Sequence, residues 1–436
     1  MTATYRGPGD DPGGIGDPDG IDLAGVDLTD LDRFAEGFPH DVFCTLRRDA
    51  PVWFHPPTSH TPGGEGFWVL SRHRDVLAVA GDGATFSSAT GGGRDGGGTL
   101  IEDLPNGFAA GVLLNMMDDP RHQRIRQLLT PAVAPRALAA MEDDLRQRSR
   151  TIVDDAVERG ACDFLRDVAA ELPLQAIARV LGVPQEDRHD LFAWAEATLD
   201  YDDRDLGEQG DRAAAASAAM FTYGTDLIER RRSEPGDDML SVLVHARVAG
   251  DEQDAPPGPL TELELQMFFN LLIAAGSETT RNSIALGVLA LVDHPGQWAE
   301  LRADRALLPG AIEEMLRWSS STTYNRRTAT RDTEIDGRPV AAGDKVTLWW
   351  ASANRDEEVF DDPFRFDIRR SPNRHLAFGH GAHFCLGANL ARLEMRVLLD
   401  ELLDRVAALE VTGPPEWVRS NKHTGLRHLP VRLHPA

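Results

Sequence analysis

The longest uninterrupted helical pattern in the chain runs from a capping box at Thr261 to about Val292. Thr261 is followed three residues later by Glu264, a pairing that closes the first turn of a helix, and the run contains no proline. A helix of roughly 30 residues would be about 45 Å long, because each residue adds ~1.5 Å. Such a helix crosses a whole domain, so the sequence predicts a mainly α-helical protein built around it.

The flanking segments predict further helices and a small β region. From about 120 to 320, apolar residues recur at three- and four-residue spacing, and a last strong helix is expected over 386–407. A hairpin is predicted over 52–70 and a short strand over 345–350. The glycine-rich stretch Gly91–Gly98 is expected to be a mobile loop without regular structure, serving either as a linker or as a lid over a pocket.

The formal net charge of −25 argues against two classes of partner. Nucleic acids and anionic membrane surfaces both repel a chain with 70 acidic and 45 basic residues. No run reaches the ~18 apolar residues that a membrane span needs. The arginines concentrate at 121–150, 317–331 and 365–374, so the fold can still present one basic face.

The N-terminus and the cysteines indicate the compartment. Residues 1–20 are rich in Gly, Asp and Pro and lack the apolar core of a signal peptide, so we expect a disordered tail before a single domain over 21–436. The three cysteines, Cys44, Cys162 and Cys385, are too few and too widely spaced for a disulfide framework. We therefore expect a cytoplasmic protein that acts as a monomer.

Cys385 stands in the most informative segment, Phe378–Gly387. Glycines there allow backbone amides to approach the sulfur, and the apolar run that follows predicts a helix starting beside it. A helix N-terminus favours an anion, so the thiol is expected to be a thiolate, which is a suitable axial ligand of haem iron. A zinc site of His380, His383 and Cys385 is an alternative, with cramped spacing and no nearby fourth ligand, and an inert buried cysteine is another.

This segment resembles the haem-binding loop of cytochromes P450, whose pattern is Phe-x-x-Gly-x-x-x-Cys-x-Gly. The fixed positions are met by Phe378, Gly381, Cys385 and Gly387, and the residues that follow are similar to the bacterial soluble branch of the family. The resemblance implies the cytochrome P450 fold, mainly α with a small β region. It also implies a b-type haem whose iron is bound by Cys385, with Phe378, Gly379 and Gly387 beside it.

The segment Ala275–Thr280 lies in the middle of the long predicted helix. Glycine and adjacent hydroxyl residues are unfavourable inside a helix, which suggests a compensating function, although a kink in the core would also explain them. The segment resembles a motif of the same family at every position. The resemblance places Ala275 and Gly276 beside the haem, and makes Glu278 and Thr279 an acid–alcohol pair that delivers protons to bound oxygen.

Basic side chains suited to haem propionates occur in three places. His122 and Arg126 are four residues apart and therefore share one helical face. The resemblance implies that both donate to propionates, as do Arg327 and His383. A surface ion pair is the alternative for each.

Glu314 and Arg317 are three residues apart, also on one helical face. Such pairs are common on any helix, but this one is similar to the Glu-x-x-Arg pair of the family. The resemblance makes Arg365 the third member of a buried structural network around the haem.

The substrate pocket is inferred from family position. Its walls are expected to include 85–116, parts of 190–225 and the turn near 421–425. The candidate pocket residues are Met116, Met117, Ala274, Ala275, Thr323 and Asn325. Within the family the chain resembles bacterial hydroxylases of sterol side chains and methyl-branched lipids, but Asn325 and the Gly91–Gly98 loop weigh against a purely lipid substrate.

These features predict a haem-thiolate monooxygenase that hydroxylates an unactivated carbon of a small hydrophobic substrate, such as a sterol, terpenoid, branched lipid or secondary metabolite, with O2. The chain has no flavin or iron–sulfur motif, so a ferredoxin and its reductase are the expected electron source, with Arg121 and Arg124 as candidate docking contacts. Peroxide-driven oxidation and C–C or C–N coupling are alternative chemistries. A haem-binding sensor is a further alternative, against which the pair Glu278–Thr279 argues.

Overall fold

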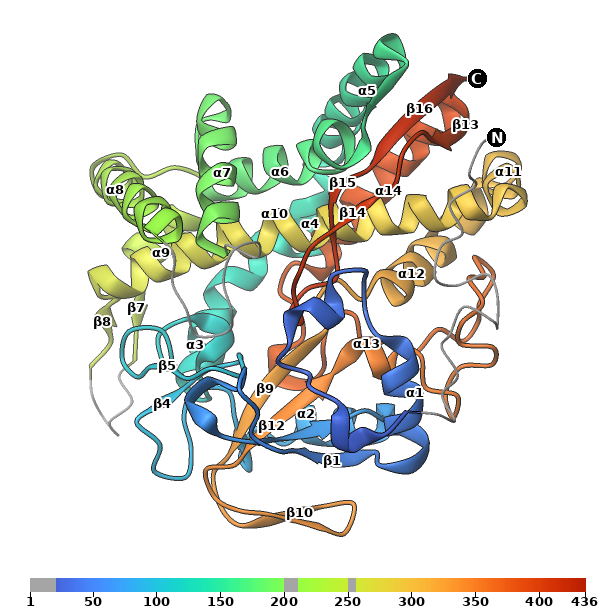
Figure 1. The fold of residues 1–436 in the computed structure, drawn as a ribbon. Coiled ribbons are helices and arrows are strands. Elements are labelled where there is room, and N and C mark those ends of the chain that lie inside the picture. Colours follow the sequence, from blue (N-terminus) through green and yellow to red (C-terminus); the bar gives the residue numbers. More distant parts are fainter. Residues whose placement is uncertain (1–20, 200–210, 250–255) are drawn as a thin grey trace.

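The computed structural model describes residues 21–199, 211–249 and 256–436. Within these ranges one long helix, α10, separates a group of helices from a region of short sheets (Figure 1). The helices are α1 (His40–Asp49), α2 (His73–Gly81), α3 (Arg121–Leu129), α4 (Pro135–Ala139), α5 (Glu142–Arg159), α6 (Glu171–Leu181), α7 (Arg188–Leu199), α8 (Asp211–Ser233), α9 (Met239–His245), α10 (Glu262–Asp293), α11 (Pro295–Ala303), α12 (Leu308–Ser319), α13 (Trp350–Ala353) and α14 (Ala388–Arg405). The tail predicted over 1–20 lies outside the described residues.

The strands are short and form several small sheets. They are β1 (Val52–His55), β2 (Phe67–Leu70), β3 (Phe86–Ser87), β4 (Gly96–Gly97), β5 (Leu104–Pro105), β6 (Ala161–Asp163), β7 (Arg247–Val248), β8 (Gly258–Pro259), β9 (Tyr324–Ala329), β10 (Thr333–Ile335), β11 (Arg338–Val340), β12 (Lys345–Trp349), β13 (Val406–Val411), β14 (Glu416–Trp417), β15 (Leu426–His428) and β16 (Pro430–Pro435). The largest sheet has the order β1-β2-β12-β9-β3, and β13-β16-β6 form another. The prediction of a mainly α protein with a small β region is confirmed.

Helix α10 begins as the sequence predicts. The Thr261 hydroxyl accepts a hydrogen bond from the Glu264 N–H at 3.2 Å, and the Glu264 carboxylate accepts one from the Thr261 N–H at 2.8 Å. The helix has 32 residues, most of them buried, and it packs against α6, α7, α8 and α12. Arg121 of α3 forms an ion pair with Glu264, so the start of α10 is also fixed to a neighbouring helix.

The predicted hairpin over 52–70 is confirmed, since β1 and β2 pair antiparallel with Val52 opposite Leu70. Strand β12 joins them, parallel to β2 and antiparallel to β9. Strand β9 lies directly after α12 and a short turn, and it carries Arg327 toward the end of the sheet. The sheet therefore links the N-terminal part of the chain to residues near the predicted site.

The prediction that Gly91–Gly98 lacks regular structure is wrong in part, because Gly96 and Gly97 form strand β4 and pair with β5. A side chain on Gly97 would place its Cβ 1.8 Å from the Ala89 carbonyl oxygen, so only glycine permits this close approach. Arg94 forms ion pairs with Glu65 and Asp103 and holds the loop against the sheet.

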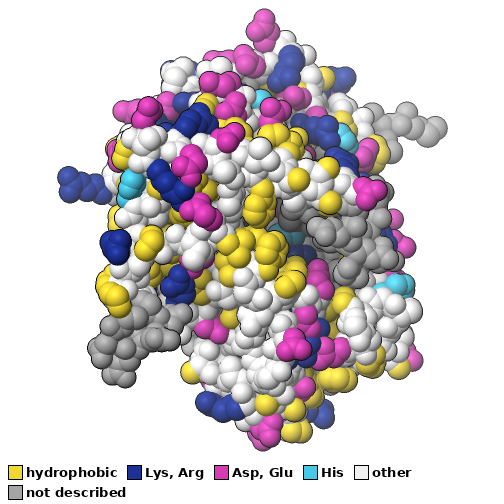
Figure 2. Space-filling model, turned by 90° about the vertical axis from the view of Figure 1, so that its left-hand side faces the viewer, with side chains coloured by type: hydrophobic (Ala, Val, Ile, Leu, Met, Phe, Trp, Pro, Cys, Tyr) yellow, Lys and Arg dark blue, Asp and Glu magenta, His cyan; other side chains and the backbone are white. Residues whose placement is uncertain are grey.

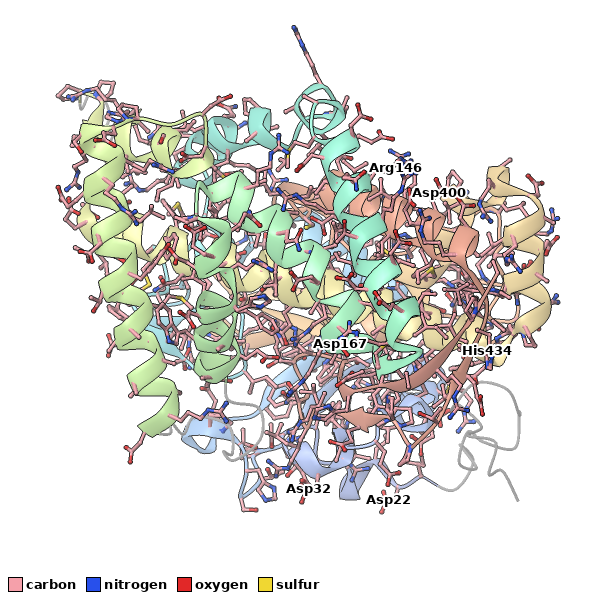
Figure 3. The ribbon with its side chains drawn as sticks, turned by 90° about the horizontal axis from the view of Figure 1, so that it is seen from above. Asp22, Asp32, Arg146, Asp167, Asp400 and His434 are labelled. Atoms are coloured by element: carbon pink, nitrogen blue, oxygen red, sulfur yellow. The ribbon has the colours of Figure 1, made fainter. Side chains whose placement is uncertain are left out.

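The helical side is further joined by ion pairs at the surface. Arg146 of α5 and Asp400 of α14 lie side by side, 2.6 Å apart between Nη1 and Oδ2 (Figure 3). On the face that includes α7, α8 and α9, hydrophobic side chains gather near the centre and charged side chains of both signs surround them (Figure 2). Within the described ranges, no helix combines the length and the apolar character needed to cross a membrane.

Candidate haem and substrate site

Cys385 lies in the tight loop that precedes α14. Its N–H donates to the Phe378 carbonyl at 2.8 Å, and Gly379 and Gly381 have φ angles of 70° and 72°. A Cβ added to Gly381 would lie 2.6 Å from the Ala80 carbonyl, so glycine lets the loop pack directly on α2. The N–H groups of Gly387 and Ala388 point to the sulfur, as the glycine pattern predicts.

The Cys385 sulfur faces the inside of the molecule. The residue has accessible surface, yet protein atoms surround the thiol on all sides, so this surface borders an internal space. Burial raises the pKa of the thiol, and this outweighs the opposing effects of the Gly387 N–H and the Arg126 guanidinium. Without a metal, burial thus favours the neutral thiol, and the expected thiolate stays a prediction for the metal-bound site. A metal cation at the sulfur would reverse the balance, because coordination deprotonates a thiol.

The middle of α10 also contains residues with accessible surface. Ala275 is exposed and Thr279 is half-buried, whereas Ser277 and Glu278 between them are buried. The Thr279 hydroxyl donates to the Ala275 carbonyl at 3.1 Å, while Glu278 is buried. Helix α10 packs against α14, and we call the space that the predicted haem would occupy between the cysteine loop and Ala275 and Thr279 of α10 the inner chamber.

Gly276 packs against α6, and its predicted place beside the haem stays a prediction. A Cβ added to this residue would lie 2.7 Å from the Ile177 side chain of α6. The glycine therefore permits close packing of α10 against α6, and its contribution to the inner chamber comes from the helix backbone alone.

Four basic side chains gather beside the cysteine loop. The rings of His122 and His383 lie 4.2 Å apart between centroids, and Arg126 donates to the Phe384 carbonyl at 2.5 Å. Arg327 is buried, and its one side-chain hydrogen bond among the described residues goes to the Arg326 carbonyl, at 2.9 Å. The predicted residues are thus brought together from α3, β9 and the loop.

Of this cluster, His122 lies 3.0 Å from the Asp119 carboxylate, whereas the two arginines have no carboxylate in contact among the described residues. Burial lowers the pKa of Arg327 to about 10, and burial together with Arg327, His122 and Arg126 lowers the pKa of His383 to about 2. In the part of the chain that the structure describes, no carboxylate lies within 4.0 Å of Arg126 or Arg327. Buried cations without partners are costly, so the cluster fits a group that carries carboxylates, as the propionates of haem do.

The family model that matches the chain is "Cytochrome P450", over residues 100–421. The chain belongs to the cytochrome P450 family. It is 52% identical to cytochrome P450 126 of Mycobacterium tuberculosis over 420 residues, covering 94% of this chain and 98% of that protein. It is 39% identical to the methyl-branched lipid omega-hydroxylase of the same species, covering 95% and 96%, and 37% identical to the steroid C26-monooxygenase of Rhodococcus jostii, covering 93% and 84%.

Solved structures agree with this assignment. A Mycobacterium marinum cytochrome P450 in complex with pseudoionone superposes with a TM-score of 0.85 at 34% identity, covering 94% of this chain and 98% of that one. The protein is therefore a P450 monooxygenase with the cytochrome P450 fold, and its cofactor is a haem with thiolate-bound iron. Among the described residues no group of three His, Cys, Asp or Glu is placed to hold a metal ion, so the zinc alternative has no support.

The Glu-x-x-Arg pair of this P450 is completely buried. Glu314 and Arg317 form two hydrogen bonds of 2.7 Å, between both carboxylate oxygens and two guanidinium nitrogens. The prediction that Arg365 completes the network is wrong, because its side chain is 68% exposed and only its carbonyl oxygen takes part. Arg370 occupies that place, with Nε 3.2 Å from the Glu314 carboxylate. The segment 365–374 contains four arginines, and spacing alone does not distinguish them.

The predicted pocket residues of this P450 divide into two groups. Met116, Met117 and Thr323 are buried, and the Thr323 hydroxyl donates to the Asn421 carbonyl. Ala274, Ala275 and Asn325 keep some accessible surface, and the Asn325 side-chain oxygen accepts from Trp350 at 2.9 Å. The Asn325 side-chain oxygen thus has a partner within the protein. The place of both groups in the pocket wall stays a prediction.

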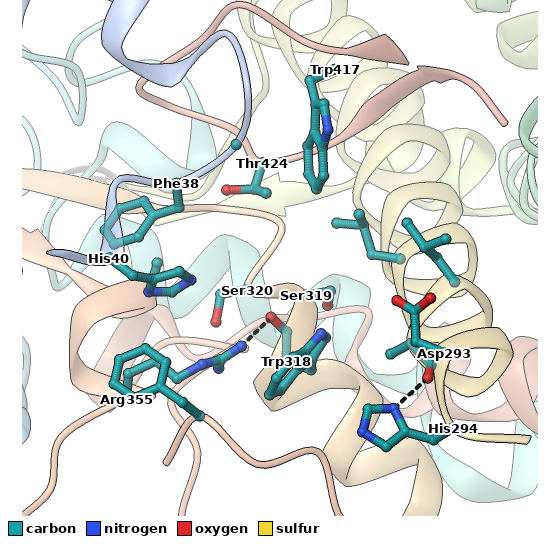
Figure 4. A pocket seen from close by; sticks show the side chains of 16 residues that line it. Phe38, His40, Asp293, His294, Trp318, Ser319, Ser320, Arg355, Trp417 and Thr424 are labelled. Carbon is teal, nitrogen blue, oxygen red and sulfur yellow. Dashed lines mark hydrogen bonds between the residues drawn. The ribbon is translucent and has the colours of Figure 1, made fainter. Parts of the chain in front are cut away.

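A separate cavity of this P450 lies beside the C-terminal end of α10 (Figure 4). Aromatic side chains, including Phe38, Trp318 and Trp417, line it together with the buried Arg355. Arg355 donates to the Trp318 carbonyl at 2.9 Å and lies 4.3 Å from the ring of the same residue. None of the residues predicted to bind haem contributes to this cavity, so it is distinct from the site around Cys385.

Proposed function

We propose that this P450 hydroxylates an unactivated carbon of a small hydrophobic substrate, with O2 and with electrons from a ferredoxin and its reductase. The observation that carries the proposal is the Thr279 hydroxyl, which borders the inner chamber next to the buried acid Glu278. A monooxygenase must deliver protons to oxygen at the iron, and a sensor has no need of such a pair. The relatives named for a methyl-branched lipid and a steroid, and the neighbour that binds pseudoionone, favour a hydrophobic substrate.

Each group of residues has a role in this proposal. When bound, the haem supplies the iron that activates O2. Cys385 would bind the iron as a thiolate, and the N–H groups of Gly387 and Ala388 would moderate its donation of electron density. Thr279 Oγ1 gives a proton into the inner chamber, and Glu278 restores it.

The four basic residues orient the cofactor. Arg327 is buried and has no ion-pair partner among the described residues, so it would bind one propionate directly. His122, His383 and Arg126 would complete the propionate site from the other side of the loop. Pairing with propionates would also raise the pKa of Arg327 back toward its ordinary value.

The ferredoxin would bind on the cysteine side of the molecule. Arg121 and Arg124 remain the candidate contacts; Arg121 is ion-paired with Glu264, with Nε 3.1 Å from the carboxylate, and Arg124 donates to the Ala249 carbonyl at 3.0 Å. The free thiols of Cys44 and Cys162 fit a reducing compartment, and we place the protein in the cytoplasm as a monomer.

The test is the absorption spectrum of the dithionite-reduced protein with carbon monoxide. We expect a Soret band near ~450 nm, because thiolate donation distinguishes this kind of haem site. Steady ferredoxin-dependent consumption of NADPH with formation of a hydroxylated product would then establish turnover. A haem protein with this band but no product from any hydrophobic substrate would favour the sensor alternative.

Substitution of Thr279 by alanine tests the proton delivery. We expect O2-driven product formation to fall by ~100-fold or more, because positioned acid–base groups contribute that much. Peroxide already carries the protons, so peroxide-driven oxidation should change by less than about threefold. The measurement compares product formed per NADPH with product formed per peroxide.

The matched control is Ser277→Ala on the same helix. The Ser277 hydroxyl donates to the Ile273 carbonyl at 2.8 Å, as Thr279 does to Ala275, but it is buried away from the inner chamber. Its loss should leave the ratio of product to NADPH unchanged. Equal losses in both variants would indicate a change in helix geometry and would contradict the assigned role.

A further inference from the structure

The chain has only two lysines among its 45 basic residues, and both are enclosed by the protein. The Lys345 ammonium lies 3.1 Å from both Glu65 and Asp103 and is fully compensated. Lys422 differs, because its ammonium donates only to the carbonyl oxygens of Tyr324 at 2.6 Å and Thr99 at 3.3 Å. Within the described ranges no carboxylate reaches it. Since an ammonium has three donors, one remains available.

Lys422 belongs to the turn between β14 and β15, which closes one side of the site. The Thr323 N–H donates to the Lys422 carbonyl at 3.0 Å, and the turn packs on α10 so closely that a Cβ on Gly425 would lie 2.4 Å from the Asn282 side chain. Asn282 is three residues, or about one helical turn, after Thr279. Lys422 keeps accessible surface although protein encloses its ammonium, and Gly425 joins its turn to the part of α10 that follows Thr279.

Among the described residues, the Lys422 ammonium has no carboxylate in contact to balance its charge. Burial lowers its pKa to about 7, Arg327 acts in the same direction, and Glu102 opposes both. The Tyr324 ring lies 4.6 Å from the ammonium, and burial lowers the pKa of the adjacent His423 to about 3, which keeps that imidazole neutral. An ammonium in such a place is costly unless an anion joins it.

We propose that Lys422 binds the carboxylate of the substrate, so that this P450 hydroxylates a hydrophobic acid at a carbon remote from its acid group. The inference rests on the proposed function of the site and narrows its substrate class. The reaction consumes the acid, O2, two electrons from ferredoxin and two protons, and it forms the hydroxy acid and water. A phosphate would require several cations or an arginine fork, whereas Lys422 offers one ammonium beside a neutral histidine.

Binding of matched acids and esters tests the proposal. The probes are octanoate, dodecanoate, hexadecanoate and cholanoate, each beside its methyl ester, titrated calorimetrically into the haem-loaded protein at about pH 6, below the Lys422 pKa. We expect at least one acid to bind ~10-fold or more tightly than its ester, as a charged hydrogen bond would provide. In Lys422→Met the ratio of the affinities for the acid and its ester should fall to about one.

The control is Arg432→Met, which removes the same unit charge from an exposed ion pair with Glu410 on β16. It should keep the preference for the acid. If Lys422 only links the carbonyl oxygens of Tyr324 and Thr99, the protein should bind each acid and its ester with equal affinity. The proposal is overturned if no acid binds more tightly than its ester, or if the preference survives in Lys422→Met.

A second measurement needs no methionine variant. Protein labelled with 13Cε-lysine should give two lysine signals, which Lys422→Arg would assign. In the diamagnetic reduced protein with carbon monoxide, the Lys422 signal should titrate near the pKa of about 7 and stay protonated to higher pH when the acid binds. Glu102, Arg327, Tyr324 and His423 are the other titratable or charged groups that face it. If the acid and its methyl ester give the same titration midpoint for Lys422, the proposal is refuted. Absence of the ~450 nm band would instead refute the proposed function.

Discussion

Replacement of Cys385 by serine is expected to remove the ~450 nm band and to lower O2-dependent turnover by at least ~1,000-fold, equivalent to ~4 kcal/mol of barrier. The thiolate is the only electron-rich ligand that the loop offers, and the burial that raises the pKa of this thiol would hold a serine hydroxyl protonated even more firmly. Haem content should fall less than activity, because the cations at His122, Arg126, Arg327 and His383 remain. Spectra and turnover are measured at equal haem content.

Cys162→Ser is the matched control for this change. Cys162 is half-buried on β6, and burial raises the pKa of its thiol to about 11, so it shares the general environment of Cys385 but not its loop. We expect an unaltered spectrum and unaltered turnover. A ~450 nm band that persisted in Cys385→Ser would show that another sulfur binds the iron.

Those parts of the fold that depend on local sequence were predictable. The capping box at Thr261, the absence of proline up to Val292 and the alternation over 52–70 act through neighbours in sequence, and α10 and the hairpin follow them. The Gly91–Gly98 loop depends on distant partners. Arg94 forms ion pairs with Glu65 and Asp103, and no sequence pattern within the loop predicts those ion pairs.

The site divides in the same way. The family motif indicated Cys385, and the spacing of His122 and Arg126 placed them on one helical face. The structure brings His122 and Arg126 next to the cysteine loop, and their binding of haem stays a prediction. The pKa of Cys385 was not predictable, because burial depends on the whole fold. Lys422 carried one signal in the sequence, its rarity, since a chain that uses arginine elsewhere has only two lysines.

Substitution of Glu314 by glutamine is expected to lower the free energy of unfolding by ~3–5 kcal/mol. Glu314 has no exposed side-chain surface and accepts hydrogen bonds from Arg317, from Arg370, from the Asp367 N–H at 2.9 Å and from Asn373 at 3.0 Å. Glutamine keeps the volume but leaves two buried guanidinium groups without an anion, and its amide faces donors where the carboxylate accepted. Urea denaturation of haem-loaded protein, followed by circular dichroism, measures the change.

Arg370→Met and Arg365→Met distinguish the network seen here from the one that spacing alone suggests. The Arg370 side chain is 9% exposed and donates to Glu314 and to the carbonyl oxygens of Asp361, Asp362 and Arg365, so its loss should cost ~2–3 kcal/mol. The Arg365 side chain is 68% exposed, and its nearest ionic partner, Asp367, lies 4.0 Å away, so its loss should cost less than ~0.5 kcal/mol. Equal costs for the two variants, or a larger cost at Arg365, would mean that the buried cation beside Glu314 is misassigned. A larger cost at Arg370 would place the stabilising role in the cation that contacts the carboxylate.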